Sequence, residues 1–98
     1  MSDSDADGDR EPPIEDESVP SEAVLDELFA TIESRKAELP EGSYTTSLFT
    51  DEKGENAVLE KIGEEATETI LAAKDDDRDE LTGESADLVY HLLVLLAM

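Results

Sequence analysis

Residues 56–74, NAVLEKIGEEATETILAAK, and residues 77–98, DRDELTGESADLVYHLLVLLAM, decide the fold. In the first stretch, apolar residues recur at the spacing of one helix face. That face comprises Val58, Leu59, Ile62, Ala66, Ile70 and Ala73. In the second stretch, Asp77 is followed three residues later by Glu80, which is typical of a capping box and predicts a helix running to the end of the chain. A short acidic linker between two such helices favours an antiparallel pair.

A third helix is expected upstream, from Ser21 as its N-cap to a stop at Pro40. Its apolar stripe comprises Val24, Leu25, Leu28, Phe29 and Ile32. Residues 40–55 are rich in glycine and hydroxyl side chains, so we expect a long loop anchored by Leu48 and Phe49. Ordered loops of this length tend to be functional. Three helices without a persuasive strand predict an all-α helical bundle.

The composition excludes several classes of partner. The 98 residues carry 28 Asp and Glu against 7 Lys and Arg, a net charge of −21. Such a chain repels nucleic acid and anionic membrane surfaces. Residues 1–22 hold nine acids and one base, so we expect a disordered acidic tail before an all-α domain at 23–98. Because the excess of acid persists in that domain, we interpret the charge as halophilic adaptation, with a nucleic-acid mimic as the rarer alternative.

Cysteine is absent, which excludes disulfides and thiolate metal sites and agrees with a reducing cytoplasm. The N-terminal residues have neither the basic nor the apolar region of a secretory signal. The longest apolar run, at residues 92–98, is too short to span a membrane. We therefore expect a cytoplasmic protein that acts away from the membrane.

Acidic residues at helical spacing suggest a metal site. Lys61, Glu65 and Glu68 border the apolar face of one helix, while Glu84 and Asp87 border that of the next. If the helices pack antiparallel, these carboxylates converge, and their repulsion calls for a divalent cation. Oxygen ligands favour a hard ion such as Mg²⁺.

The structural alternative is that such acid pairs are ordinary solvated helix faces, which arise readily in so acidic a chain. The position of Glu65 beside the apolar face favours a site. For His91, a hydrogen-bonded histidine at the edge of the core is a better interpretation than a metal ligand.

Two segments read together resemble a known family. They are KIGEEATE at 61–68 and ESADLVYH at 84–91, preceded by SYT at 43–45. Residues 23–98 resemble the phosphoribosyl-ATP pyrophosphatases, which act in the second step of histidine biosynthesis. That family belongs to the MazG-like all-α NTP pyrophosphohydrolases, marked by ExxE and then ExxD. Here the two motifs are separated by fifteen residues.

The resemblance implies Mg²⁺-dependent hydrolysis of phosphoribosyl-ATP to phosphoribosyl-AMP and pyrophosphate, by cleavage between the α and β phosphates. The metal ligands it implies are Glu65, Glu68, Glu84 and Asp87. The catalytic acids are Glu64 and Glu65, either of which would orient or deprotonate the attacking water. The substrate contacts are Lys61, Arg35, Lys36, Ser43, Tyr44 and Thr45.

The family usually continues into another helix, whereas this sequence stops at Met98 inside an apolar helix. We therefore expect either a truncated or a naturally short domain. Its apolar surface predicts a homodimer that completes a bundle around each site. Two other functions remain open. One is a house-cleaning pyrophosphohydrolase of non-standard nucleoside triphosphates, and the other is a non-catalytic acidic helical interaction module.

Overall fold

The computed structural model describes residues 21–98, and all regular structure within them is helical. The predicted acidic tail lies outside these residues, except for Ser21 and Glu22. The elements are a 3-10 turn, η1, and four helices. In chain order they are η1 (Ser21–Ala23), α2 (Val24–Glu38), α3 (Tyr44–Phe49), α4 (Glu55–Lys74) and α5 (Arg78–Ala97). The all-α fold is therefore confirmed.

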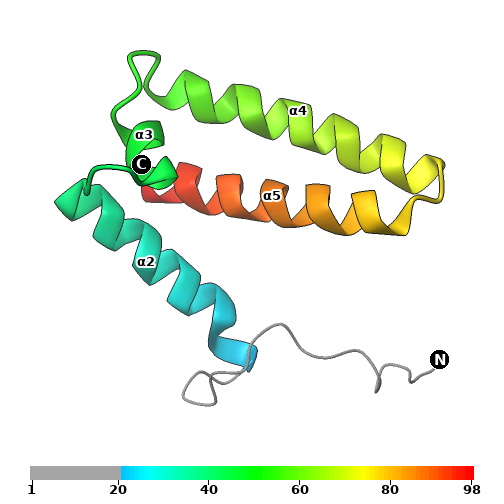
Figure 1. Cartoon of the computed structure of the whole chain (residues 1–98), viewed down its shortest axis with the longest axis horizontal. Coiled ribbons are helices and arrows are strands. Elements are labelled where there is room, and N and C mark those ends of the chain that lie inside the picture. The colour runs from blue at the N-terminus through cyan, green and yellow to red at the C-terminus, as the bar shows by residue number, and fades with distance from the viewer. Residues whose placement is uncertain (1–20) are drawn as a thin grey trace.

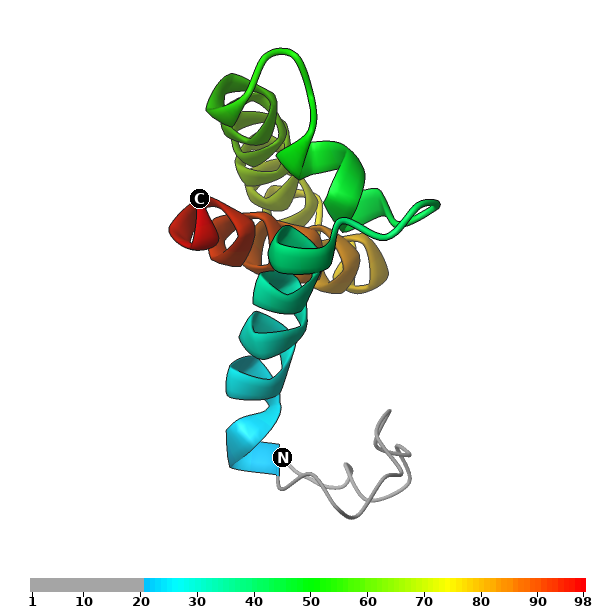
Figure 2. The same cartoon turned by 90° about the vertical axis from the view of Figure 1, so that its left-hand side faces the viewer.

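Two long helices, α4 and α5, form an antiparallel hairpin and lie side by side along their whole length (Figure 1). The start of α4 and the end of α5 form one end of this hairpin, where α2 and α3 pack. From that end α2 runs away from the hairpin, as the turned view shows (Figure 2). The other end of the hairpin, at the turn between α4 and α5, extends beyond α2 and α3.

The boundaries of α2 follow local chemistry. The helix begins at Val24 and not at Ser21, because the first three residues form a 3-10 turn and Ala23 takes the N-cap position. It ends at Glu38, as Pro40 predicts. Leu39 turns the chain in a left-handed conformation (φ 50°), and its N–H donates to the Arg35 carbonyl at 2.8 Å.

The prediction of a continuous loop over residues 40–55 was wrong, because α3 lies within it. Ser43 caps this helix, and its hydroxyl accepts the Thr46 N–H at 3.2 Å. Leu48 is buried and Phe49 packs against the core, so both predicted anchors are confirmed. Packing of these two side chains outweighs the weak helix propensity of the threonines.

One of the two hydrogen bonds of the capping box predicted for α5 is present. Asp77 is the N-cap, and its carboxylate accepts the Glu80 N–H at 3.1 Å. Helix α4 begins at Glu55, one residue before the predicted start, with Gly54 in the N-cap position. Within residues 21–98, none of the helices combines the length with the apolar composition that a membrane span requires.

The core is small and lies at one end of the hairpin. It joins all four helices through Ile32, Leu48, Val58, Val94 and Ala97. Other residues on the predicted apolar faces are not covered by the single chain: Leu59 is 44% exposed and Ile70 60% exposed. The single chain therefore covers only part of the predicted apolar face of α4, which packs mainly against α5.

Gly54 is a point at which the backbone requires glycine. Its φ of 62° and ψ of −136° lie in a region that side chains with a Cβ rarely adopt. We expect Gly54→Ala to lower the free energy of unfolding by about 1–3 kcal/mol. Urea unfolding followed by circular dichroism measures the change. The neighbouring exposed substitution Asn56→Ala is the control and should stay within about 0.5 kcal/mol; an equal loss from both would contradict the backbone explanation.

Candidate active site

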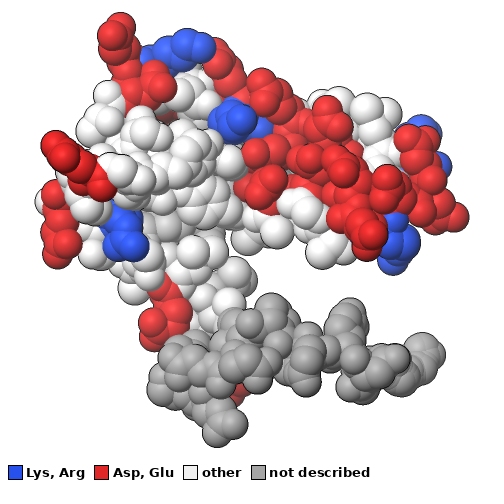
Figure 3. All heavy atoms as spheres, viewed as in Figure 1, with Lys and Arg blue, Asp and Glu red and all other residues white. Residues whose placement is uncertain are grey.

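A cleft of about 320 Å³ lies between α4 and α5, beyond the apolar core. Five carboxylates and one ammonium group line it. The lining residues are Lys61, Glu64, Glu65 and Glu68 from α4, and Glu84 and Asp87 from α5. Acidic side chains crowd this half of the hairpin, whereas uncharged atoms cover much of the half that carries α2 and α3 (Figure 3). The predicted convergence of carboxylates across the two helices therefore occurs.

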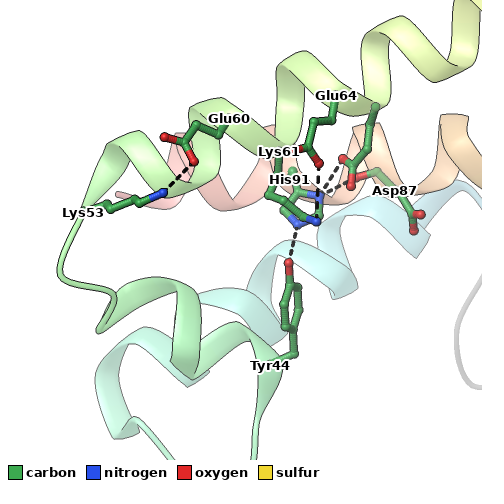
Figure 4. Close-up of polar contacts among 8 residues, drawn as sticks. Tyr44, Lys53, Glu60, Lys61, Glu64, Asp87 and His91 are labelled. Atoms are coloured by element: carbon green, nitrogen blue, oxygen red, sulfur yellow. Dashed lines mark hydrogen bonds and ion pairs between the residues drawn. The ribbon is translucent and has the colours of Figure 1, made fainter.

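Lys61 is the cation of the cleft lining. Its Nζ lies 3.7 Å from Glu64 Oε1, and the side chains of Lys61 and Glu64 are 43% and 67% exposed. A long ion pair between exposed groups contributes little to stability. The ammonium group therefore remains available for an anionic ligand (Figure 4).

Glu65 differs from the other acids because it is buried, with 7% of its surface exposed. Its Oε1 lies 2.7 Å from Nδ1 of His91, which is 4% exposed. The same nitrogen lies 3.0 Å from the Asp87 carbonyl oxygen. Since both neighbours are acceptors, we assign the hydrogen to Nδ1, which donates to them. The interpretation of His91 as a hydrogen-bonded residue at the core edge is confirmed.

The other ring nitrogen of His91 faces α3. The Tyr44 hydroxyl lies 3.0 Å from Nε2 and donates to it in this tautomer (Figure 4). Partial burial raises the pKa of the Tyr44 phenol, and nearby Lys61 acts in the opposite direction. The phenol is therefore a neutral donor at neutral pH. Next to it, the Thr45 and Tyr90 hydroxyls hydrogen-bond to each other. Two adjacent hydrogen bonds therefore join α3 to α5.

A second group of carboxylates lies toward the hairpin turn. Oxygens of Glu68, Glu80 and Glu84 lie within 4.8 Å of one another. Desolvation raises the pKa of Glu84, as do a hydrogen bond with Glu80 and the charges of Glu80, Asp87 and Glu68. Sequence reasoning assigned Glu80 only to helix capping. Its position one turn before Glu84 was the signal that it also faces this cluster.

The remaining predicted substrate residues do not line the cleft. Lys36 donates from Nζ to the Ala97 carbonyl oxygen at 2.7 Å, at the C-terminus of α5. Ser43 caps α3, and Thr45 bonds to Tyr90. Arg35 lies in the last turn of α2. Of the six predicted substrate residues, Lys61 lines the cleft, and Tyr44 bonds to His91, the partner of Glu65. The other four residues do not line the cleft.

The donor set fits a hard divalent cation. Carboxylate oxygens from two helices face one space, and the pKa of Glu84 is raised there by desolvation first and also by the neighbouring acids Glu80, Asp87 and Glu68. Oxygen-only ligation of this kind suits Mg²⁺ or Mn²⁺ better than zinc.

We expect Glu84→Gln to raise the melting temperature of the metal-free protein, more at neutral than at acid pH. A raised pKa in the folded state means that protonation of Glu84 favours folding. This contribution is complete below the ordinary carboxyl range and is lost as pH rises through the raised pKa. Melting curves in chelator, from about pH 4 to about pH 8, measure the difference. Exposed Glu33→Gln gives the background, and a difference independent of pH would contradict the repulsion.

The sequence matches a family model described as phosphoribosyl-ATP pyrophosphohydrolase over residues 25–98. A phosphoribosyl-ATP pyrophosphatase of Haloarcula marismortui is 79% identical over 75 residues, covering 76% of each chain. That of Haloquadratum walsbyi is 64% identical over 83 residues, covering 85% of this chain and 82% of the relative. The histidine biosynthesis bifunctional protein HisIE of Halalkalibacterium halodurans is 58% identical over 73 residues, covering 74% of this chain and 34% of the relative.

The haloarchaeal relatives fit the halophilic interpretation of the charge. The chain belongs to the phosphoribosyl-ATP pyrophosphohydrolase family.

Proposed function

We propose that this protein hydrolyses phosphoribosyl-ATP to phosphoribosyl-AMP and pyrophosphate, in the second step of histidine biosynthesis. The observation that carries the proposal is the cleft between α4 and α5, in which the carboxylates of ExxE and ExxD face one another beside Lys61. Family membership supports the choice of substrate. In the reaction, water attacks one of the two phosphorus atoms that flank the oxygen between the α and β phosphates. The bond from that phosphorus to the bridging oxygen breaks, and phosphoribosyl-AMP and pyrophosphate are released.

The metal ligands in this proposal are Glu65, Glu68, Glu84 and Asp87, and the ion is Mg²⁺. When bound, Mg²⁺ would neutralise triphosphate charge, lower the pKa of a bound water and stabilise charge on the leaving pyrophosphate. The four carboxylates fit this role because they line one cleft from both helices. Without a counter-ion, a triphosphate would meet only repulsion from them.

Two groups of the chain act on the substrate and on water. Lys61 contacts a phosphate oxygen, for which its long, exposed ion pair with Glu64 leaves it available. Glu64 or Glu65 orients or deprotonates the attacking water. The two differ in environment: Glu64 is exposed at the cleft, whereas Glu65 is buried and hydrogen-bonded to His91. The first has the greater freedom to reach a water molecule.

The rest of the substrate extends beyond the cleft. Phosphoribosyl-ATP carries adenine, two riboses and a further phosphate besides the triphosphate, and the cleft holds only about 320 Å³. Tyr44 is a proposed contact because 52% of the residue is exposed while its hydroxyl bonds to His91. The other proposed contacts, outside the cleft lining, are Arg35, Lys36, Ser43 and Thr45.

Glu65→Gln and Asp87→Asn should each lower turnover of phosphoribosyl-ATP by at least about 100-fold, the scale typical of groups that stabilise transition-state charge. Both substitutions remove a negative charge and keep the side-chain shape, so circular dichroism should still show the helices. Pyrophosphate release in Mg²⁺ and high salt measures turnover. Glu33→Gln on α2 is the exposed control and should be unaffected.

A non-catalytic module predicts that all three variants behave alike, and that result would contradict the proposal. Running dCTP and dUTP beside phosphoribosyl-ATP tests the substrate. Preferential cleavage of either deoxynucleotide would favour the house-cleaning activity over the histidine pathway.

We also propose that the protein is a homodimer. The buried apolar core of the described residues is small for a domain of this length. Large side chains stay exposed on the half of the hairpin that α2 and α3 do not reach, including Ile70 at 60% and Leu71 at 49%. A second copy offers the same apolar face, and its pairing would complete a four-helix arrangement beside each cleft.

Ile70→Glu should convert the dimer to monomer and lower its melting temperature, because it places a charge in the proposed interface at a side chain that is 60% exposed in the isolated chain. Light scattering after size-exclusion chromatography in high salt measures the mass. Thr31→Glu, which adds the same charge to the exposed face of α2, is the control. A monomeric unsubstituted protein, or a dimer that tolerates Glu at position 70, would contradict this assembly.

We also propose that the protein acts in the cytoplasm on a small-molecule substrate. The absence of cysteine supports action in the reducing cytoplasm. The net charge of −21 supports a small-molecule substrate over nucleic acid, because phosphate backbones would be repelled where no metal intervenes.

A further inference from the structure

His91 joins two parts of the molecule that are distant in the sequence. Through Nδ1 it contacts Glu65 of α4, and through Nε2 it contacts Tyr44 of α3. The imidazole is also held from a third side, because Nδ1 lies 3.0 Å from the Asp87 carbonyl oxygen one turn earlier in α5. With 4% of its surface exposed and both ring nitrogens engaged, the ring has one orientation.

Glu65 is the cleft carboxylate with the least access to water, and it needs this contact. A buried carboxylate is costly unless hydrogen bonds replace its hydration. His91 supplies one to Oε1, and Glu65 also lines the cleft, so Oε2 is the oxygen that His91 leaves for a ligand there. The long side chain is thereby held in one conformation before any ligand arrives. Its exposed neighbours Glu64 and Glu68 have far more freedom.

We infer that His91 is a positioning residue that orients Glu65 toward a divalent cation in the cleft, and that Tyr44 fixes the imidazole for this task. The inference rests on the proposed metal role of Glu65. Outer hydrogen bonds of this kind pre-organise a ligand, so the protein does not have to restrain the side chain when the metal binds. The arrangement also links the metal ligand to α3, which carries a proposed substrate contact.

Two isosteric substitutions separate the two nitrogens of the ring. The amide nitrogen of Asn occupies the place of Nδ1, so His91→Asn keeps a donor for Glu65. The amide of Gln reaches instead the place of Nε2, so His91→Gln loses that donor. Mn²⁺ binding to the full chain, measured without substrate from the electron paramagnetic resonance signal of free Mn²⁺, reports on the site directly. We expect His91→Gln to weaken Mn²⁺ binding by about 10- to 100-fold and His91→Asn to retain most of the affinity.

The control for lost packing is Val94→Ala, one turn away in α5 at a fully buried position. It should lower the melting temperature and leave Mn²⁺ affinity unchanged. A second pair removes single hydroxyls that join α3 to α5. Tyr44→Phe should weaken Mn²⁺ binding more than Tyr90→Phe, since the Tyr44 hydroxyl hydrogen-bonds to His91 whereas the Tyr90 hydroxyl bonds to Thr45. This pair decides the question if the His91 variants do not fold.

The outcomes separate this inference from the proposed function. If His91→Gln binds Mn²⁺ as tightly as the unsubstituted protein, or if Asn and Gln lose affinity equally, His91 does not position Glu65. In both cases the metal site itself stands, provided that Glu65→Gln lowers Mn²⁺ affinity. If the unsubstituted protein does not bind Mn²⁺, or Glu65→Gln binds it equally well, the proposed metal role of Glu65 fails and this inference fails with it.

Discussion

Repulsion among the carboxylates of the α4–α5 cleft is the constraint on which the rest of the structure depends. Five acids line a space of about 320 Å³, with Lys61 as their neighbouring cation. Packing of the apolar core at the other end of the hairpin must offset this repulsion, because the helices cannot separate without exposing Val58 and Val94. The fold therefore holds like charges together, and a site of that kind gains stability from a cation.

The cleft acids are not equivalent, and the difference lies in their environment. Glu65 is buried and held by His91, whereas Glu64, Glu68 and Asp87 face solvent. In the metal site that we propose, one restrained carboxylate would act beside exposed ones. The contact between His91 and Tyr44 extends this restraint to α3.

Surface charge and exposed apolar area act in opposite directions on assembly. The strongly acidic surface opposes close approach of two copies, while exposed side chains such as Ile70 and Leu71 favour it. High salt screens the first effect and strengthens the second. A protein with this surface would therefore associate best under the saline conditions that its composition and its haloarchaeal relatives indicate.

The sequence by itself determined what depends on local periodicity and spacing. It predicted α4, α5 and the Asp77 cap, and it predicted that acids at helical intervals would face one another, because residues three or four apart share a helix face. Tertiary structure alone decided the rest. Helix α3 forms because Leu48 and Phe49 find a core, and the partners of His91 come from residues 26 and 47 positions away. Which apolar residues of α4 remain exposed was likewise settled by packing, since α4 packs mainly against α5. Such contacts are set by how helices pack in space, and the pattern within any one helix does not contain that information.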